Sequence, residues 1–162
     1  RPMSWNPDTG LIYLPAQNNN SYYEKAEGFE YEQGVWNTGT VRGAGSRPPR
    51  PELIGPRAML LAWDPVSNSE VWRAEGVGRN GGTLSTAGNL VFRGSGNQLI
   101  AHDARTGEQL WTARVGDGTA TPVAYELDGR QYISILAGTT SDGPPRMSTF
   151  VLDGSAVIPS GR

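Results

Sequence analysis

Short apolar segments recur along the chain and are separated by segments rich in glycine, proline, asparagine and aspartate. This pattern is typical of β-strands joined by turns, because an amphipathic helix would repeat its apolar residues every three to four positions over a longer stretch. A short first strand is expected before Asn6. The strands expected after it are Leu11–Leu14, Met59–Trp63, Glu70–Ala74, Leu84–Ala87, Leu90–Gly94, Gln98–His102, Gln109–Arg114, Ala120–Glu126, Gln131–Ala137 and Met147–Leu152.

Two turns are marked clearly by their residues. Residues 6–10 read Asn-Pro-Asp-Thr-Gly, in which proline pre-sets φ, aspartate bonds its own backbone and glycine takes a positive φ. Asp128-Gly129 is the strongest hairpin signal, because a two-residue turn of this type needs positive φ. By contrast, residues 17–57 predict an excursion of about 40 residues with little regular structure, and loops of this length are usually functional or disordered.

A repeat is the most informative pattern in the chain. The segment Ala62–Trp72 aligns without gaps with Ala101–Trp111, and both place a tryptophan eight residues after an aspartate. A truncated third copy occupies residues 150–154. A repeat of about 40 residues containing four short strands is the signature of a propeller blade. We therefore expect an all-β fold made of propeller blades: a partial propeller of three to four four-stranded antiparallel sheets, in which each repeat tryptophan lies flat against the next blade.

Composition supports this fold and narrows the function. Glycine (22 residues) and proline (12) are well above average usage, and both disfavour helices. A net charge of -2, with no basic patch, argues against nucleic acid as a partner. The chain contains no cysteine, which excludes disulfides and thiolate metal sites within it. No apolar run approaches the length needed to span a bilayer.

Candidate chemistry is sparse and centres on Asn80, Gly81, Gly82 and Thr83. The glycine pair lets the backbone approach a ligand closely, and Asn80 can donate a hydrogen bond to a ligand oxygen. The alternative is an ordinary turn entering a strand. The single histidine, His102, is expected to point outward from a strand without a catalytic role. The glutamates of residues 24–32 predict a solvated acidic face rather than a metal site, and no catalytic or metal-binding residue is assigned.

The second repeat, Ala101-x-Asp103-x-x-Thr106-Gly107-x-x-x-Trp111, resembles the tryptophan-docking motif of the quinoprotein alcohol dehydrogenases, which depend on pyrroloquinoline quinone (PQQ) and form eight-bladed propellers. Residues 1–17, 80–92 and 122–133 also resemble the C-terminal part of that family, and residues 80–92 are the most specific stretch. The resemblance therefore implies that residues 1–162 are a C-terminal propeller segment interrupted by the excursion at about 17–57.

The resemblance also implies a function for the full-length protein, namely PQQ-dependent oxidation of a primary alcohol to an aldehyde in the periplasm. This segment would supply blades and part of the pocket wall, with Asn80, Gly81, Gly82 and Thr83 facing the quinone. Calcium ligands and the catalytic carboxylate are expected upstream, so the isolated segment is expected to be inactive. The other implied partners are an alcohol, the remaining blades, and cytochrome c or a similar electron acceptor, with haem c carried by a separate domain or a partner.

Relatives often carry tryptophan near the loop before the glycine pair, whereas this chain has Val77-Gly78-Arg79 there, which departs from the family pattern. The alternative function is a non-enzymatic propeller scaffold that binds protein partners. Whether the excursion covers a substrate funnel or meets a partner subunit also stays open.

Overall fold

The computed structural model describes residues 1–19, 24–41, 55–76, 80–138 and 144–155. The chain divides into two compact units. Unit 1 comprises residues 1–18 and 56–162, and unit 2, residues 19–55, lies within the predicted excursion. The described part of the chain forms strands and contains no helix, so the all-β prediction is confirmed.

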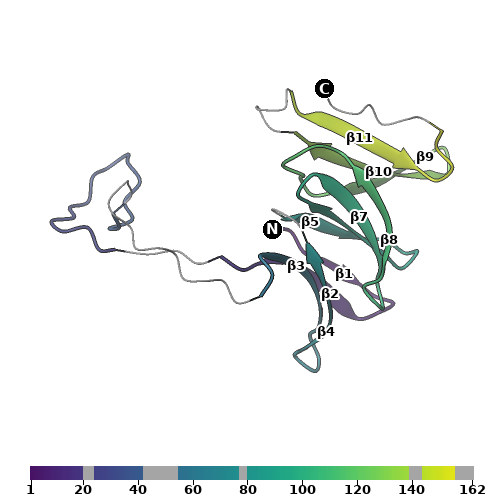
Figure 1. Cartoon of the computed structure of the whole chain (residues 1–162), viewed down its shortest axis with the longest axis horizontal. Coiled ribbons are helices and arrows are strands. Elements are labelled where there is room, and N and C mark those ends of the chain that lie inside the picture. Colours follow the sequence, from purple (N-terminus) through teal and green to yellow (C-terminus); the bar gives the residue numbers. More distant parts are fainter. Residues whose placement is uncertain (20–23, 42–54, 77–79, 139–143, 156–162) are drawn as a thin grey trace. The chain divides into compact units, whose positions relative to one another are not determined.

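Unit 1 is built from three antiparallel sheets, each made of strands that follow one another along the chain (Figure 1). The first sheet contains β1 (Ser4–Asn6), β2 (Leu11–Gln17), β3 (Ala58–Asp64) and β4 (Ser69–Gly76). The second contains β5 (Asn80–Ser85), β6 (Leu90–Ser95), β7 (Gln98–Asp103) and β8 (Gln109–Arg114). The third contains β9 (Val123–Leu127), β10 (Arg130–Ala137) and β11 (Arg146–Val151), so it has three strands among the described residues where four were expected.

The sheets pack face to face in chain order, and two apolar clusters lie between them. The cluster between the first and second sheets consists of Leu11, Tyr13, Leu60, Ala62, Val91 and Ala104, with Trp72 against it. The cluster between the second and third sheets consists of Phe92, Leu99, Ala101, Val115, Ile133, Ile135 and Ala137. The second sheet is therefore covered on both faces, which explains why β6 and β7 are buried along almost their whole length.

The repeat tryptophans make unequal contacts with the following sheet. Trp72 donates from Nε1 to the Ala104 carbonyl oxygen at 3.1 Å, and its ring lies so close to Gly107 that a Cβ there would come within 2.5 Å of the ring. Trp111 instead meets Phe150 edge-on, with ring centroids 5.1 Å apart, and stays 40% exposed.

Several strand boundaries differ from those predicted: β2 extends to Gln17 rather than Leu14, and the starts of β5 and β9 are displaced. β5 begins at Asn80 rather than Leu84, because the glycine pair lies inside the strand as a bulge instead of forming a turn before it. β9 begins at Val123 rather than Ala120, because residues 119–121 pack across the glycines of the second sheet instead of pairing in the third. The predicted turns are confirmed at Gly10 (φ 71°) and at Asp128 and Gly129 (φ 51° and 73°).

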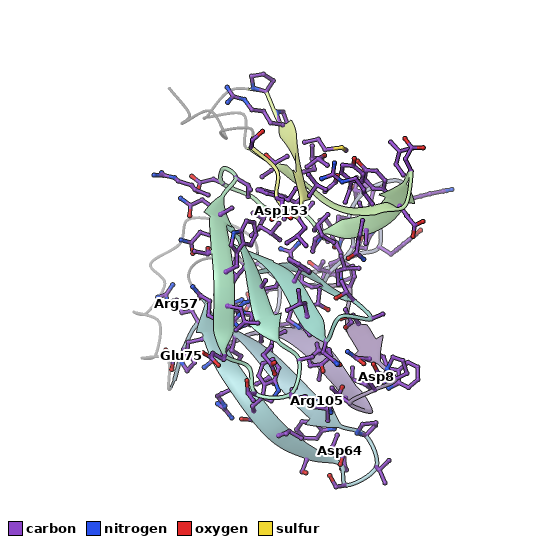
Figure 2. The ribbon with its side chains drawn as sticks, turned by 90° about the vertical axis from the view of Figure 1, so that its right-hand side faces the viewer. Asp8, Arg57, Asp64, Glu75, Arg105 and Asp153 are labelled. Atoms are coloured by element: carbon purple, nitrogen blue, oxygen red, sulfur yellow. The ribbon has the colours of Figure 1, made fainter. Side chains whose placement is uncertain are left out.

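Five charged residues mark two edges of unit 1. Asp8, Asp64 and Arg105, which belong to turns, lie toward one edge, whereas Arg57 and Glu75 lie together at another (Figure 2). Strand register agrees, since Ala58 pairs with both Gln17 and Gly76. The two ends of the excursion, at Gln17 and Ala58, and the end of β4 at Gly76 therefore lie at one edge.

Unit 2 has little regular structure in its described part. Its backbone is joined by an antiparallel bridge between Lys25 and Thr40, and the Asn37 side chain bonds both the amide and the carbonyl of Glu32. Phe29, Tyr31 and Trp36 are exposed.

Candidate functional site

The predicted site lies at the start of β5, the first strand of the second sheet. β5 lies against β1 and β2 of the first sheet. Its register with β6 shifts between Asn80, which pairs with Ser95, and Thr83, which pairs with Arg93. Gly81 and Gly82 therefore form a β-bulge, a feature often found next to active sites.

The glycine pair is required by close approach of the chain itself. A Cβ at Gly81 would come within 2.4 Å of the Ala120 carbonyl oxygen, and one at Gly82 within 2.3 Å of the Thr121 hydroxyl. Gly94 on β6 is equally crowded by Thr119, at 2.5 Å. The space beside these glycines is thus filled by residues 119–121, of which sequence reasoning assigned Ala120 and Thr121 to a strand. A ligand at this site would meet the backbone edge of β5 rather than the faces of Gly81 and Gly82.

Thr83 anchors β5 to the first sheet. Its amide donates to the Pro2 carbonyl oxygen at 3.1 Å, and its hydroxyl donates to the Tyr13 carbonyl oxygen at 3.2 Å. Thr83 is buried, and both of these donors are used within the chain. The backbone of Asn80 lies in β5, but its side chain is outside the described part of the structure. The cofactor-binding assignment of Asn80–Thr83 therefore stays a prediction.

Arg93 on β6 is the most unusual side chain near this site, and sequence reasoning missed it. It is 1% exposed, and it donates to the carbonyl oxygens of Glu75 at 2.6 Å and of Ala74 at 3.4 Å. The structure records no carboxylate partner for it among the described residues, where its Nε also lacks a partner. Burial lowers the pKa of its guanidinium to about 10, so Arg93 stays charged at neutral pH. The signal in the sequence was a lone arginine inside the apolar strand Leu90–Gly94.

His102 on β7 does not point outward, so that prediction was wrong. Its ring is 1% exposed and lies 6.4 Å from the Trp72 ring, centroid to centroid. Nδ1 is 2.9 Å from the Gly107 carbonyl oxygen, and Nε2 has no partner among the described residues. Burial lowers the pKa of His102 to about 4, so the ring is neutral at pH 7. The error arose because both faces of the second sheet are covered, so neither face of β7 is a solvent face.

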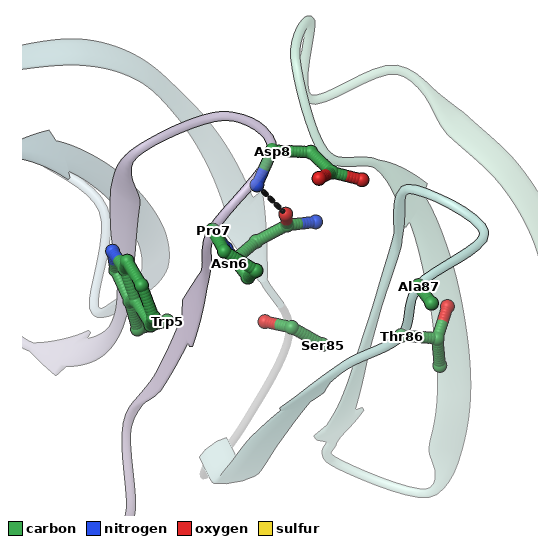
Figure 3. Close-up of a pocket in the computed structure, with 7 residues that line it drawn as sticks. All are labelled: Trp5, Asn6, Pro7, Asp8, Ser85, Thr86 and Ala87. Carbon is green, nitrogen blue, oxygen red and sulfur yellow. Dashed lines mark hydrogen bonds between the residues drawn. The ribbon is translucent and has the colours of Figure 1, made fainter.

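A shallow pocket lies at the opposite end of β5, between the β1–β2 turn and the β5–β6 turn (Figure 3). It is lined by Trp5, Asn6, Pro7, Asp8, Ser85, Thr86 and Ala87. The Asn6 side-chain oxygen accepts from the Asp8 amide at 2.8 Å, and Ser85 bonds Ser4 at 2.7 Å. These polar groups stabilise the turn and the contact between sheets, and they bring together no acid–base pair.

The described residues form neither a metal site nor a membrane-spanning helix. No group of three or more histidine, cysteine, aspartate or glutamate residues is arranged there to hold a metal ion. The carboxyls of Asp64 and Asp103 have lowered pKa values because they accept hydrogen bonds within their own turns, chiefly from Ser67 and from the Thr106 amide respectively. No helix in the described part of the chain is long and apolar enough to cross a bilayer.

Comparison with known proteins identifies a family for this arrangement. Residues 59–133 match the model of the family described as glucose/ethanol/alcohol dehydrogenase, beta-propeller domain, which is designated PQQ. The 1-butanol dehydrogenase (cytochrome c) of Thauera butanivorans is 42% identical over 98% of this chain and 26% of its own length. The quinohemoprotein alcohol dehydrogenase of Comamonas testosteroni is 41% identical over 98% of this chain and 25% of its own length.

Solved structures give the same result. The crystal structure of the Comamonas testosteroni quinohemoprotein alcohol dehydrogenase superposes with a TM-score of 0.84 at 39% identity, over 98% of this chain and 26% of that one. A europium-containing methanol dehydrogenase superposes with a TM-score of 0.67 at 26% identity, over 85% of this chain and 24% of that one. The chain thus spans about a quarter of the length of these relatives, and its sheets are propeller blades, as predicted.

Proposed function

Because this chain is a segment of a β-propeller of the quinoprotein alcohol dehydrogenase family, we propose that the full-length protein is a PQQ-dependent alcohol dehydrogenase that oxidises primary alcohols to aldehydes. One observation carries the proposal: nearly the whole chain matches, in sequence and in fold, about a quarter of the length of proteins named as alcohol dehydrogenases. In this proposal, the present chain supplies blades and part of the wall of the quinone pocket.

The proposed wall is the start of β5. The bulge at Gly81–Gly82 displaces the backbone, and residues 119–121 support it from behind. Thr83 fixes the far end of the bulge to the first sheet. The backbone groups of Asn80 and Gly81, together with the Asn80 amide, would then face the quinone, which when bound accepts two electrons from the alcohol. The described residues fit this supporting role, because they shape and hold the backbone without supplying an acid or a base.

The remaining blades are proposed to cover the outer faces of this segment. On the far side of the third sheet, β9 exposes Val123, Tyr125 and Leu127, while Leu136 and Met147 of the neighbouring strands lie on the same face. An apolar face of this kind needs a covering layer. We also assign the contact of Trp72 with Ala104 and Gly107 to a tryptophan-docking motif that joins one blade to the next.

Other parts of the proposed enzyme lie outside this segment. Calcium would be bound by residues upstream, together with the carboxylate that takes the alcohol proton. Electrons would pass to cytochrome c or a similar acceptor, with haem c in a separate domain or partner, a proposal supported by the words quinohemoprotein and cytochrome c in the names of relatives. The periplasm is the proposed location.

The test is to load the full-length protein with PQQ and calcium chloride and to follow reduction of an artificial electron-acceptor dye with primary alcohols of different length. Turnover that requires both PQQ and a primary alcohol is expected. The isolated chain of residues 1–162 should give none, because it lacks the proposed carboxylate. A full-length protein that binds no quinone would overturn the proposal and favour the scaffold function. Robust turnover by the isolated chain would refute the proposal that the catalytic carboxylate and the calcium ligands lie outside residues 1–162.

A further inference from the structure

Burial of the Arg93 guanidinium costs free energy of folding, so stability alone does not explain why an arginine lies there. Its guanidinium is charged and 1% exposed, yet its recorded hydrogen bonds go only to the main-chain carbonyls of Ala74 and Glu75. Replacement of buried charged groups by well-packed apolar residues of similar volume is often neutral or stabilising. What an apolar residue cannot do is hold two carbonyl oxygens at a defined position.

Those two carbonyls belong to the end of β4, the strand that precedes the proposed cofactor wall in the sequence. Ala74 and Glu75 lie at the end of β4, which stops at Gly76, and β5 begins at Asn80. The Arg93 backbone pairs with Thr83, at the other end of the glycine bulge. A single residue therefore contacts the strand that precedes the wall through its side chain and the strand that contains the wall through its backbone.

Thr83 extends this connection to the first sheet. Its amide and hydroxyl donate to the carbonyls of Pro2 and Tyr13, so β5 is fixed to the β1–β2 side of the first sheet. Arg93, on the neighbouring strand β6, bonds the end of β4 in the same first sheet. Arg93 itself is too deeply buried within the chain to touch a ligand at the edge of β5. Its influence on a ligand must therefore act through the position of residues 80–83.

We propose that Arg93 is a positioning residue for the cofactor wall, which fixes the distance between the end of β4 and the glycine bulge of β5 and thereby presents the bulge to the quinone. This inference rests on the proposed function. Displacement of a binding group by about 1 Å is enough to cost up to about a hundredfold in function. Loss of the guanidinium should therefore weaken quinone binding more than it weakens the fold.

The experiment compares Arg93→Met, Arg93→Lys and wild type in the full-length protein. Two quantities are measured: the dissociation constant for PQQ in the presence of calcium chloride, from quenching of tryptophan fluorescence, and the urea midpoint of unfolding. We expect Arg93→Met to raise the dissociation constant about tenfold or more while its urea midpoint stays near that of wild type. Arg93→Lys keeps the charge but reaches the two carbonyls less well, so its dissociation constant should lie between the other two.

The matched control is His102→Gln. His102 lies on the same face of the second sheet, since it pairs with Val91, two residues from Arg93, but its recorded hydrogen bond goes to Gly107 and not to the end of β4. This variant should change the urea midpoint without changing the dissociation constant for PQQ. If Arg93→Met fails to fold, the test rests on Arg93→Lys. A dissociation constant of Arg93→Lys for PQQ equal to that of wild type then overturns the inference.

The outcomes separate the two proposals. A wild-type protein that binds no PQQ contradicts the proposed function. A wild-type protein that binds PQQ, together with Arg93 variants whose affinity stays within twofold of it, contradicts the positioning role and leaves the proposed function intact. Faster hydrogen exchange at the Gly81–Thr83 amides in apo Arg93→Lys than in apo wild type would support the positioning role without any bound quinone.

Discussion

The buried ring of His102 should make the stability of this protein fall between pH 7 and pH 4. Its pKa is about 4 in the folded state, because burial penalises the charged ring and the nearby Arg93 guanidinium repels it. In the unfolded chain the ordinary value is about 6.5. The unfolded state therefore binds a proton more tightly than the folded state does, and acid shifts the equilibrium toward unfolding as the pH drops through this window.

The size of the effect follows from the two pKa values. Each pH unit between them corresponds to about 1.4 kcal/mol when the ring is fully protonated in one state and neutral in the other. The unfolding free energy should fall by about 2 kcal/mol between pH 7 and pH 5, and by about 3 kcal/mol at pH 4. That loss is a large share of the roughly 5–15 kcal/mol that stabilises a typical domain.

Urea unfolding at pH 7, 6 and 5, for wild type and for His102→Gln, isolates this contribution. Glutamine is close in size, can bond the Gly107 carbonyl and does not titrate, so subtraction of the two curves cancels the other ionisable groups. We expect the wild-type advantage over His102→Gln to shrink by about 2 kcal/mol from pH 7 to pH 5. Parallel pH profiles for the two proteins would show that the ring is solvated or already paired in the folded state, and would refute the burial argument.

Three further predictions concern close contacts and turn chemistry. Gly81→Ala should destabilise the protein more than Gly82→Ala, by about 1–3 kcal/mol in urea unfolding, because the new methyl group meets a rigid backbone carbonyl in the first case and a side chain in the second. Trp72→Ala should cost about 3 kcal/mol in the same assay, since it leaves a cavity between the first two sheets and removes one of the two hydrogen bonds that the Ala104 carbonyl accepts. Ser67→Ala should raise the pKa of Asp64 toward its ordinary value, as measured by NMR titration of the carboxyl carbon, because the Ser67 hydroxyl bond is the largest cause of its low pKa.

The sequence allowed most of the fold to be predicted, because local turn chemistry repeats at each strand end. The Asp-Gly hairpin and the two complete repeats located β6, β7, β8 and β10 to within a residue or two. The start of β5 was misplaced because a glycine pair looks like a turn when only its neighbours along the chain are considered. In the structure, residues 119–121 demand glycine there, and that contact joins residues far apart in the sequence.

The two buried polar side chains were harder to predict, for a physical reason. Polar residues in a strand indicate a solvent face only where one face of the sheet is solvated. The second sheet is covered on both faces, so Arg93 and His102 had no solvent face to occupy. The single histidine of the strand Gln98–His102 was therefore given the wrong orientation, and the apolar run around Arg93 was the better guide.

The two interfaces between sheets differ in a way that bears on the proposed wall. The cluster between the second and third sheets is apolar, and apolar packing is non-directional. Between the first and second sheets, hydrogen bonds cross at defined atoms: the Tyr13 hydroxyl and Trp72 Nε1 both donate to the Ala104 carbonyl, and Thr83 donates to the Tyr13 carbonyl. Because such bonds hold only at one register, they prevent the two sheets from sliding past each other. The start of β5 lies at this interface, so the backbone that we propose to face the quinone is placed where the relative position of two blades is fixed by directional contacts.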